Sequence, residues 1–430
     1  MRIIFKEKRK LCLVFFIILS LLFLSSCGSI TPTEYTITAT AGAGGSINPS
    51  GTVSVNDGGS KTFNITPEEC YQISDVLVNG TSLGPVSTYT FVDVNQNYTI
   101  QASFNQGSRV NNLNNGKGYD TIQEAINDAN VGDTIVVCPG TYLENLYLNN
   151  EDLILRSIDP TDPVIVASTI IDAGASNSVV WFFDDESTLE GFTIRNGYAI
   201  EGGGITMSYS SPVIRNNCIE QNQATATGGG IYTYFSSPHI KNNTIINNEA
   251  AYGGGIYTDA SNPTIEDNSI THNEASNLGG GIYTLNTFSS ITDNTITNNE
   301  ATSGGGIYLS SGSSTVTGNT ITDNLANNGG GIYVIYCSST VTGNTFTDNK
   351  ASYDGGGIYV YYGSELQPKT TRPAGWGTTK ENIPSGELLN PAEAVEFTIA
   401  GNTFLGNKHG IPLKYTEGAH VFFQKGGSIL

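Results

Sequence analysis

The sequence predicts an all-β protein whose larger part is a single-stranded parallel β-helix, preceded by a smaller β-rich domain. The first observation is a phrase, Gly-Gly-Gly-Ile, whose isoleucine returns every 25 or 26 residues. The isoleucines of this column are Ile205, Ile231, Ile256, Ile282, Ile307, Ile332 and Ile358. A fixed period of this length is typical of a solenoid, in which each repeat stacks on the last.

Two further observations decide which solenoid is expected. Apolar residues alternate in short β-branched runs that are broken by Gly, Asn, Ser and Pro, which indicates strands and turns rather than helices. The composition, with 51 Gly and only 13% charged residues, favours a turn-rich β protein. One coil is therefore expected to hold three short strands and three turns, with successive coils about 4.8 Å apart.

Each column of the repeat has an expected structural role. The isoleucines should stack inside, and the glycines should permit a tight bend. Two asparagine columns should lie at bends and hydrogen-bond from coil to coil. These columns are Asn217, Asn243, Asn268, Asn294, Asn319 and Asn344, and Asn222, Asn248, Asn273, Asn299, Asn324 and Asn349.

The N-terminus resembles a secretory signal. Residues 1–26 contain a basic start and an apolar core too short for a confident membrane span. The junction Leu24-Ser25-Ser26-Cys27 resembles a bacterial lipobox, which implies cleavage before Cys27 and lipidation of its sulfur, followed by a tether over 27–33. The expected location is extracytoplasmic, on a membrane through this lipid, with Gly28 favouring an outer membrane or the cell surface. The alternative is an ordinary signal peptide with a chance cysteine.

Residues 34–106 form a separate segment of short alternating strands. Its phrases "YTITATAGAGGSINPSG", "DVLVNG" and "YTIQASF" closely resemble the divergent internalin B-type bacterial repeat domain. The resemblance implies a small β-rich spacer or adhesion module. Cys70 departs from the small residue that is common there.

Residues 107–430 carry the β-helix, and its start shows a helix signal over about 120–131. Thr121 and Glu124 have capping-box spacing, and the apolar residues that follow fall on one helical face. This start resembles the cap and first coil of the pectin-lyase-like right-handed parallel β-helices. The coils also resemble polymorphic outer-membrane-protein repeats, with Phe346-Thr347-Asp348-Asn349 fitting the aromatic half of that pattern. Because such folds include lyases, hydrolases and adhesins, the fold alone does not determine function.

The charge of the chain limits its partners. A net charge of −20 argues against nucleic acid and against anionic lipid surfaces. Polyuronates would need bridging calcium. Neither the four histidines nor the cysteines show zinc-type spacing, and the disulfide pairing of Cys70, Cys138, Cys218 and Cys337 stays open.

No catalytic residue can be assigned from the repeats. The acidic columns are short, and none has a basic residue at its own level; they are Asp267 with Asp293, Asp323 with Asp348, and Glu249 with Glu274 and Glu300. The glutamate column could hold Ca²⁺ or could be a solvated face. No cofactor is otherwise expected. The early coils also hold ionisable residues in no known template, namely Arg156, Asp159, Asp162, Asp172, Asp184, Asp185 and Arg195.

An outward tyrosine column is the predicted binding surface. One tyrosine follows each inward isoleucine, so strand alternation directs it outward. The column is Tyr232, Tyr257, Tyr283, Tyr308, Tyr333 and Tyr359. We expect an exposed aromatic stripe on which sugars or partner proteins could pack. The alternative is that the rings stack on one another and shield the strands.

A break in the rhythm after Ile358 predicts an inserted loop at about 363–393, which contains Trp376. Long loops on rigid scaffolds often carry function, so Trp376 joins the predicted binding residues.

The favoured interpretation is a surface-anchored bacterial lipoprotein with a non-catalytic binding or adhesive β-helix that contacts glycan or a partner surface. The alternatives are a polysaccharide-degrading lyase or hydrolase, and a structural spacer.

Overall fold

The computed structural model describes residues 33–150, 152–361, 396–408, 413–414 and 420–424. The predicted signal peptide, Cys27, the inserted loop and Trp376 lie outside these ranges. The chain divides into two compact units, Met1–Gly107 and Ser108–Leu430. Among the described residues, no helix combines the length and apolar character needed to cross a bilayer.

The first unit is built from two small sheets around one core. Its strands are β1 (Glu34–Ala41), β2 (Gly45–Asn48), β3 (Gly51–Asn56), β4 (Gly59–Pro67), β5 (Tyr71–Val78), β6 (Thr81–Ser82), β7 (Thr88–Val94) and β8 (Tyr98–Gln106). The sheet orders are β3-β1-β8-β5-β6 and β2-β4-β7. Alternation places Ile37, Phe63 and Ile100 in the core, fully buried. The resemblance of this unit to a known repeat domain stays a prediction.

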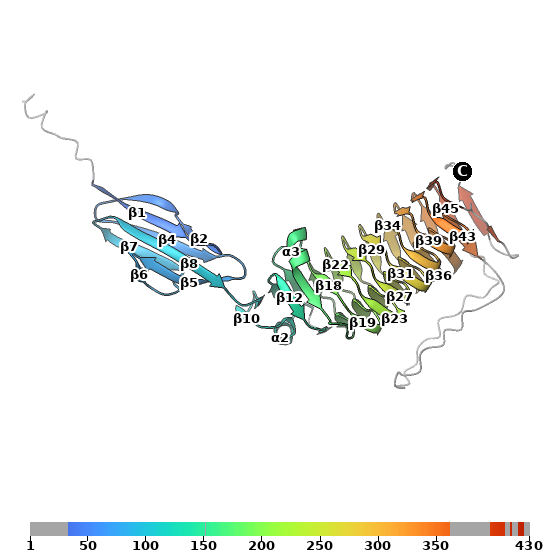
Figure 1. Ribbon diagram of the computed structural model, residues 1–430, viewed down its shortest axis with the longest axis horizontal. Helices are drawn as coiled ribbons and strands as arrows, with labels where there is room; N and C mark the ends of the chain where they lie inside the picture. The colour runs from blue at the N-terminus through green and yellow to red at the C-terminus, as the bar shows by residue number, and fades with distance from the viewer. Residues whose placement is uncertain (1–32, 151, 362–395, 409–412, 415–419, 425–430) are drawn as a thin grey trace, which may run out of the picture. The chain divides into compact units, whose positions relative to one another are not determined.

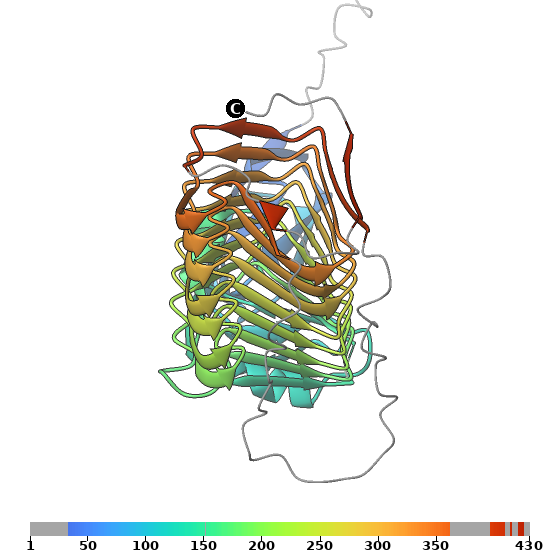
Figure 2. The same ribbon diagram turned by 90° about the vertical axis from the view of Figure 1, so that its right-hand side faces the viewer.

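The second unit is a right-handed parallel β-helix, as predicted (Figures 1 and 2). One coil runs through β29 (Thr264–Glu266), β30 (Ser269–Thr271), β31 (Glu274–Leu278) and β32 (Ile282–Thr287). Each strand pairs in parallel with its counterpart in the next coil, and Figure 2 shows coils from green to red lying over one another.

The expectation of three strands per coil is wrong for most of the helix, which has four. The additional strand follows the second asparagine of each coil and turns one small residue inward, as Ala275 does with 2% of its surface exposed. A small inward side chain lets this strand lie close to the glycine bend that follows. The recurrent Glu-Ala pair, as at Glu274, was the missed signal.

Within the described ranges, four sheets form the walls, and the strand numbers below refer to these ranges. Sheet 1 has thirteen strands, from β10 (Lys117–Tyr119) and β9 (Val110–Asn112) to β48 (His420–Gln424). Sheet 2 has ten, from β12 (Gly140–Leu143) to β46 (Thr403–Leu405). Sheet 3 has seven, from β19 (Tyr198–Glu201) to β43 (Lys350–Asp354). Sheet 4 has ten: β13 (Leu146–Asn149), β16 (Val180–Phe183), β20 (Ile205–Ser208), β24 (Ile231–Tyr234), β28 (Ile256–Asp259), β32, β36 (Ile307–Gly312), β40 (Ile332–Cys337), β44 (Ile358–Tyr361) and β47 (Leu413–Lys414).

Two short helices accompany the first coils. Helix α2 (Ile122–Asn127) is shorter than the predicted 120–131, and the Thr121 hydroxyl accepts a hydrogen bond from the Glu124 N–H at 3.2 Å. The Glu144 carboxylate accepts hydrogen bonds from the Ile122 and Gln123 N–H groups in the first turn of α2, at 3.0 and 2.9 Å. Ile122 and Ile126 are buried against the first coil. Helix α3 (Pro163–Ser168) was not predicted; Asp162 caps it.

The isoleucine column is buried as predicted, and every member has 0% exposure. The glycines before it are required for two reasons. Gly228 has φ +67°, in the left-handed region that glycine favours. At Gly229 and Gly230 a Cβ atom would come within 2.5–2.6 Å of carbonyl oxygens of the next coil. The bend therefore admits no side chain at these points.

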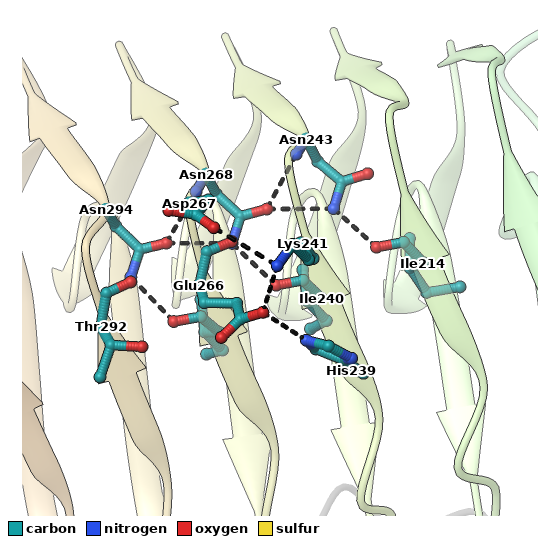
Figure 3. Close-up of polar contacts among 11 residues, drawn as sticks. Ile214, His239, Ile240, Lys241, Asn243, Glu266, Asp267, Asn268, Thr292 and Asn294 are labelled. Carbon is teal, nitrogen blue, oxygen red and sulfur yellow. Dashed lines mark hydrogen bonds and ion pairs between the residues drawn. The ribbon is translucent and has the colours of Figure 1, made fainter. Parts of the chain in front are cut away.

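The asparagine columns form two buried hydrogen-bond ladders, which confirms that prediction. The Asn268 backbone N–H and side-chain amide both donate to Asn294 Oδ1, at 2.9 and 3.0 Å. The same amide donates to the Ile240 carbonyl at 2.9 Å, and Asn268 Oδ1 accepts in turn from Asn243 (Figure 3). Each asparagine thus satisfies backbone groups that the bend removes from the sheets.

The cysteines do not share one state. Cys70 and Cys138 are disulfide-bonded, whereas Cys218 and Cys337 take part in no disulfide. Burial raises the pKa of the Cys337 thiol to about 11. Burial, followed by the charge of Glu220, raises the pKa of Cys218 to about 12. Both thiols are therefore protonated and poorly nucleophilic at neutral pH.

Removing one rung of the ladder should destabilise the protein. Asn294→Ala deprives the Asn268 N–H of its acceptor and the Ile265 carbonyl of its donor at 2.8 Å, both in buried surroundings. The free energy of unfolding should fall by about 2–5 kcal/mol, because each unpaired buried group costs about 1–3 kcal/mol. Thr295→Ala, at the exposed neighbour, should change it by less than about 0.5 kcal/mol. Equal denaturation midpoints for both variants would contradict this role.

Candidate functional site

The predicted tyrosine column exists, but the expectation that it is exposed is wrong. The six tyrosines pair in register from β24 to β44, and adjacent ring centroids lie 4.8–5.6 Å apart. Tyr232, Tyr257, Tyr283, Tyr308 and Tyr359 retain only 5–7% of their surface exposed. Tyr333 is half-buried. Alternation does direct the rings out of the central core, but other side chains cover them.

Sheet 3 supplies part of that cover. Leu278 from β31 packs on the rings, and the Tyr252 ring of the preceding coil lies 6.2 Å from that of Tyr283. On the other side lie residues two positions further along sheet 4, such as Leu285 and Ile335. The tyrosines therefore form a second apolar core outside the main one. The stacking confirms the alternative stated from the sequence, in which the rings pack on one another. The cover from sheet 3 was not predicted, because it comes from the fourth strand.

The glycine bend and the tyrosine belong to one packing unit. A Cβ atom at Gly253, whose φ is +64°, would lie 2.7 Å from the Tyr257 Cβ. The absent glycine side chain thus leaves room for the tyrosine of the same coil. Burial raises the pKa of Tyr257, Tyr283 and Tyr308 well above the usual value, so these hydroxyls stay neutral.

Exposed rings occur instead on the first coils of sheet 4. In the outward column that later holds the tyrosines, the first two residues are Tyr147 on β13 and Trp181 on β16, which pair in register. Their rings meet edge to face at 5.4 Å and remain 41% and 38% exposed. Sheet 3 begins only at β19, in the following coil, so these two coils lack the strand that covers later rings.

A second set of exposed rings lies on the neighbouring outward positions. Phe183 at the end of β16 is 38% exposed, and its ring lies 6.1 Å from Tyr209. Tyr209 and Phe235 stack face to face, with centroids 5.7 Å apart and planes within 3°. The half-buried Tyr234 contacts both of these rings edge on. We call Tyr147, Trp181, Phe183, Tyr209 and Phe235 the aromatic patch. The outward aromatic residues of "VVWFF" and "YTYFSS" were the signal that sequence reasoning missed.

Charged side chains on sheet 1 form pairs between coils. Lys241 Nζ lies 2.7 Å from Glu266 Oε1, and His239 Nε2 lies 2.9 Å from the same oxygen (Figure 3). These two hydrogen bonds, Lys241 first, hold the pKa of Glu266 below its usual value. Lys241 also reaches Asp267 at 3.5 Å, so the Asp267 column has a basic partner although it has no basic residue at its own level. The partner comes from the preceding coil.

Several early-coil carboxylates are used in local hydrogen bonds and ion pairs. Burial disfavours ionisation of Asp172, but hydrogen bonds from the Gly174 N–H, Arg195 and Asn196 together lower its pKa. Asp162 caps α3, and Asp159 accepts from Thr161. A hollow of about 280 Å³ nearby is lined by residues without ionisable carboxyl or amino groups: Gly174, Ala175, Asn196, Gly197, Tyr198, Gln221 and Gln223.

The glutamate column is in register, with Glu249 opposite Glu274 and Glu274 opposite Glu300, and all three are exposed. Within the described ranges, no three His, Cys, Asp or Glu side chains are grouped so that they could hold a metal ion. Calcium binding at this column stays a prediction.

Truncating a tyrosine of the buried column should unfold the protein more easily. Tyr283→Ala removes a ring packed against Tyr257 and Tyr308, and the free energy of unfolding should fall by about 3–5 kcal/mol. Tyr283→Phe keeps the ring and should cost about 1 kcal/mol or less. Urea denaturation measures both. A Tyr283→Ala protein that unfolds at the parent midpoint would show that the ring is not part of a packed core.

Comparison with solved structures finds distant likenesses. The chain is similar to the crystal structure of the catalytic unit of the thermostable GH87 alpha-1,3-glucanase from Streptomyces thermodiastaticus strain HF3-3, at 15% identity and a TM-score of 0.30 over 87% of this chain and 85% of that chain. It is also similar to the family 28 exopolygalacturonase of Yersinia enterocolitica, at 11% identity and a TM-score of 0.24 over 87% and 98%. Likeness at this level says nothing about activity.

No curated protein matches the chain. A family model does match, at residues 154–321 and 280–368, which together cover half of the 430 residues. These ranges contain all seven isoleucines of the buried column and most of both asparagine ladders. The chain therefore belongs to the family described as the right handed beta helix region.

Proposed function

We propose that this protein is a surface-anchored bacterial lipoprotein whose β-helix binds glycan without catalysing a reaction. The observation that carries the proposal is the concentration of exposed aromatic rings on the outer face of sheet 4. Sugar rings present flat C–H faces, and a rigid aromatic surface stacks on them with little loss of conformational entropy. The strands of a β-helix hold such rings at regular spacing on a rigid scaffold.

The tyrosine column continues, in later coils, the outward column that begins with Tyr147 and Trp181. Its rings are largely covered, so its own contact with a ligand stays a prediction, most directly for the half-buried Tyr333. Trp376 also remains a predicted contact. A partner protein in place of glycan is the other possible occupant of the outer face.

A polysaccharide panel tests the binding role. The purified protein is mixed with neutral and acidic polysaccharides and scored both for retention and for release of reducing or unsaturated ends. We expect retention without release of ends. Release of ends would favour the lyase or hydrolase alternative. If the protein is retained by no polysaccharide and releases no ends, the glycan-binding proposal is wrong. The protein would then bind a partner protein or act as a spacer.

Lipid anchoring has an independent test at Cys27. The proposal rests on the lipobox-like junction that ends at this cysteine. In a bacterial host the parent protein should partition with membranes and carry a thioether-linked lipid. Cys27→Ser should leave the chain unprocessed or release it, as judged by fractionation and mass. Unchanged partitioning and mass would contradict anchoring through Cys27.

A further inference from the structure

We infer that the aromatic patch is the binding site for an uncharged polysaccharide. The inference rests on the proposed glycan-binding function and adds to it the place of the site and the class of ligand. The five rings lie on or just after β13, β16, β20 and β24, which are four neighbouring strands of sheet 4. Three coil rises give the patch a length of about 14 Å, which suits a short run of sugar units.

The fold leaves this patch uncovered while it buries the equivalent rings further along. Trp181 and Tyr147 occupy the same outward column as Tyr257, which has 7% exposure, yet they keep 38% and 41%. The segment before β16, residues 173–179, is a loop where later coils have a strand of sheet 3. The first coils therefore hold aromatic rings in the same column as the buried tyrosines, and these rings are partly accessible.

Two rings of the patch are held in unfavourable backbone conformations. Tyr209 has φ 55° and Phe235 has φ 45°, in the left-handed region that is costly for bulky side chains. Most other coils place a small or short polar residue at this position, namely Asp184, Ala260, Asn286 and Ser311. A third aromatic residue, Tyr336, lies beyond the patch beside Tyr361.

Burial does not compensate Tyr209 and Phe235 for this conformation, because they remain 55% and 43% exposed. The conformation does align them, with ring planes within 3° of each other. Strain of this kind is maintained where a geometry serves a ligand, and it points from an observed outlier to a function. The two rings stack on each other and hold each other in place, so a sugar ring would pack on a face that this stack leaves open.

The charges beside the rings select the class of ligand. The strands and turns that carry the patch, residues 146–149, 180–187, 205–211 and 231–237, contain no Lys, Arg or His. They do contain Asp184 and Glu186, exposed just after Phe183. Carboxylates accept hydrogen bonds from sugar hydroxyls but repel uronates, and the chain as a whole carries −20. Protein interfaces are depleted in Asp and Glu, so a hydroxyl-rich neutral ligand fits better than a protein.

Affinity electrophoresis of the full chain tests the inference. The gels contain laminarin, dextran, galactomannan or hydroxyethylcellulose as neutral probes, and polygalacturonate as the acidic probe. We expect retardation by at least one neutral probe and none by polygalacturonate. Trp181→Ala should weaken that retardation about tenfold, as expected for loss of one stacking ring. Tyr353→Ala is the matched control, because this 68% exposed ring lies on sheet 3, outside the patch.

A second variant separates binding from folding. Tyr209→Asn places at φ 55° a residue that tolerates this conformation, so the thermal midpoint should stay the same or rise. Affinity for the neutral probe should nevertheless fall about tenfold. A ring with only a structural role would give the opposite pattern, with a lower midpoint and unchanged affinity.

The outcomes distinguish this inference from the proposed function. If a neutral probe binds and both patch variants bind like the parent, the inference is overturned while glycan binding stands. If polygalacturonate alone is bound, the class of ligand is wrong and glycan binding again stands. If the parent binds none of the probes, both the inference and glycan binding are overturned.

Discussion

The register between coils is the constraint on which the rest of this structure depends. Each coil must place the same kind of residue above its predecessor at a rise of about 4.8 Å, or the inward column no longer closes. The two asparagine ladders enforce this register at the bends, because one side-chain oxygen accepts from both the backbone and the side chain of its neighbour. The buried isoleucines fill the space that the ladders define. The glycine bend then turns the chain into sheet 4, at a point where carbonyl oxygens of the next coil leave no room for a Cβ atom.

The same register creates the second, tyrosine core. Once Tyr257 is fixed above one glycine bend, the rings of neighbouring coils must stack, and sheet 3 closes over them. Aromatic area that would suit a ligand is thereby used for stability. Among the described residues of this column, Tyr147 and Trp181 are exposed, and they lie where sheet 3 has not begun. The exposure of an outward ring on sheet 4 thus depends more on whether its coil contains a strand of sheet 3 than on the type of residue in the column.

The distribution of charge complements that arrangement. Two cations of the repeat coils are paired with carboxylates on sheet 1, Lys241 with Glu266 and Arg215 with Glu190. The segments that carry the aromatic patch have carboxylates and no cations. Surface ion pairs of this type add little stability, but they keep basic side chains away from an acidic outer face. A wall with rings and carboxylates on one sheet and paired charges on another is suited to hydroxylated, uncharged ligands.

The sequence by itself determined the solenoid, its period, the inward isoleucines and both asparagine columns, because those features repeat at a fixed interval and each follows from local alternation and turn chemistry. It also placed the helix cap at Thr121. It did not show the fourth strand. The recurrent Glu-Ala pair marks a segment such as Glu249–Tyr252, but so short a segment is identified as a strand only when its neighbours in other coils pair with it. Whether an outward tyrosine meets water or Leu278 depends on residues far along the coil, so only the tertiary structure decided that the tyrosine column is core. For the same reason only the tertiary structure brought Trp181, Tyr209 and Phe235 together: they come from three different coils, and packing between coils left their faces open.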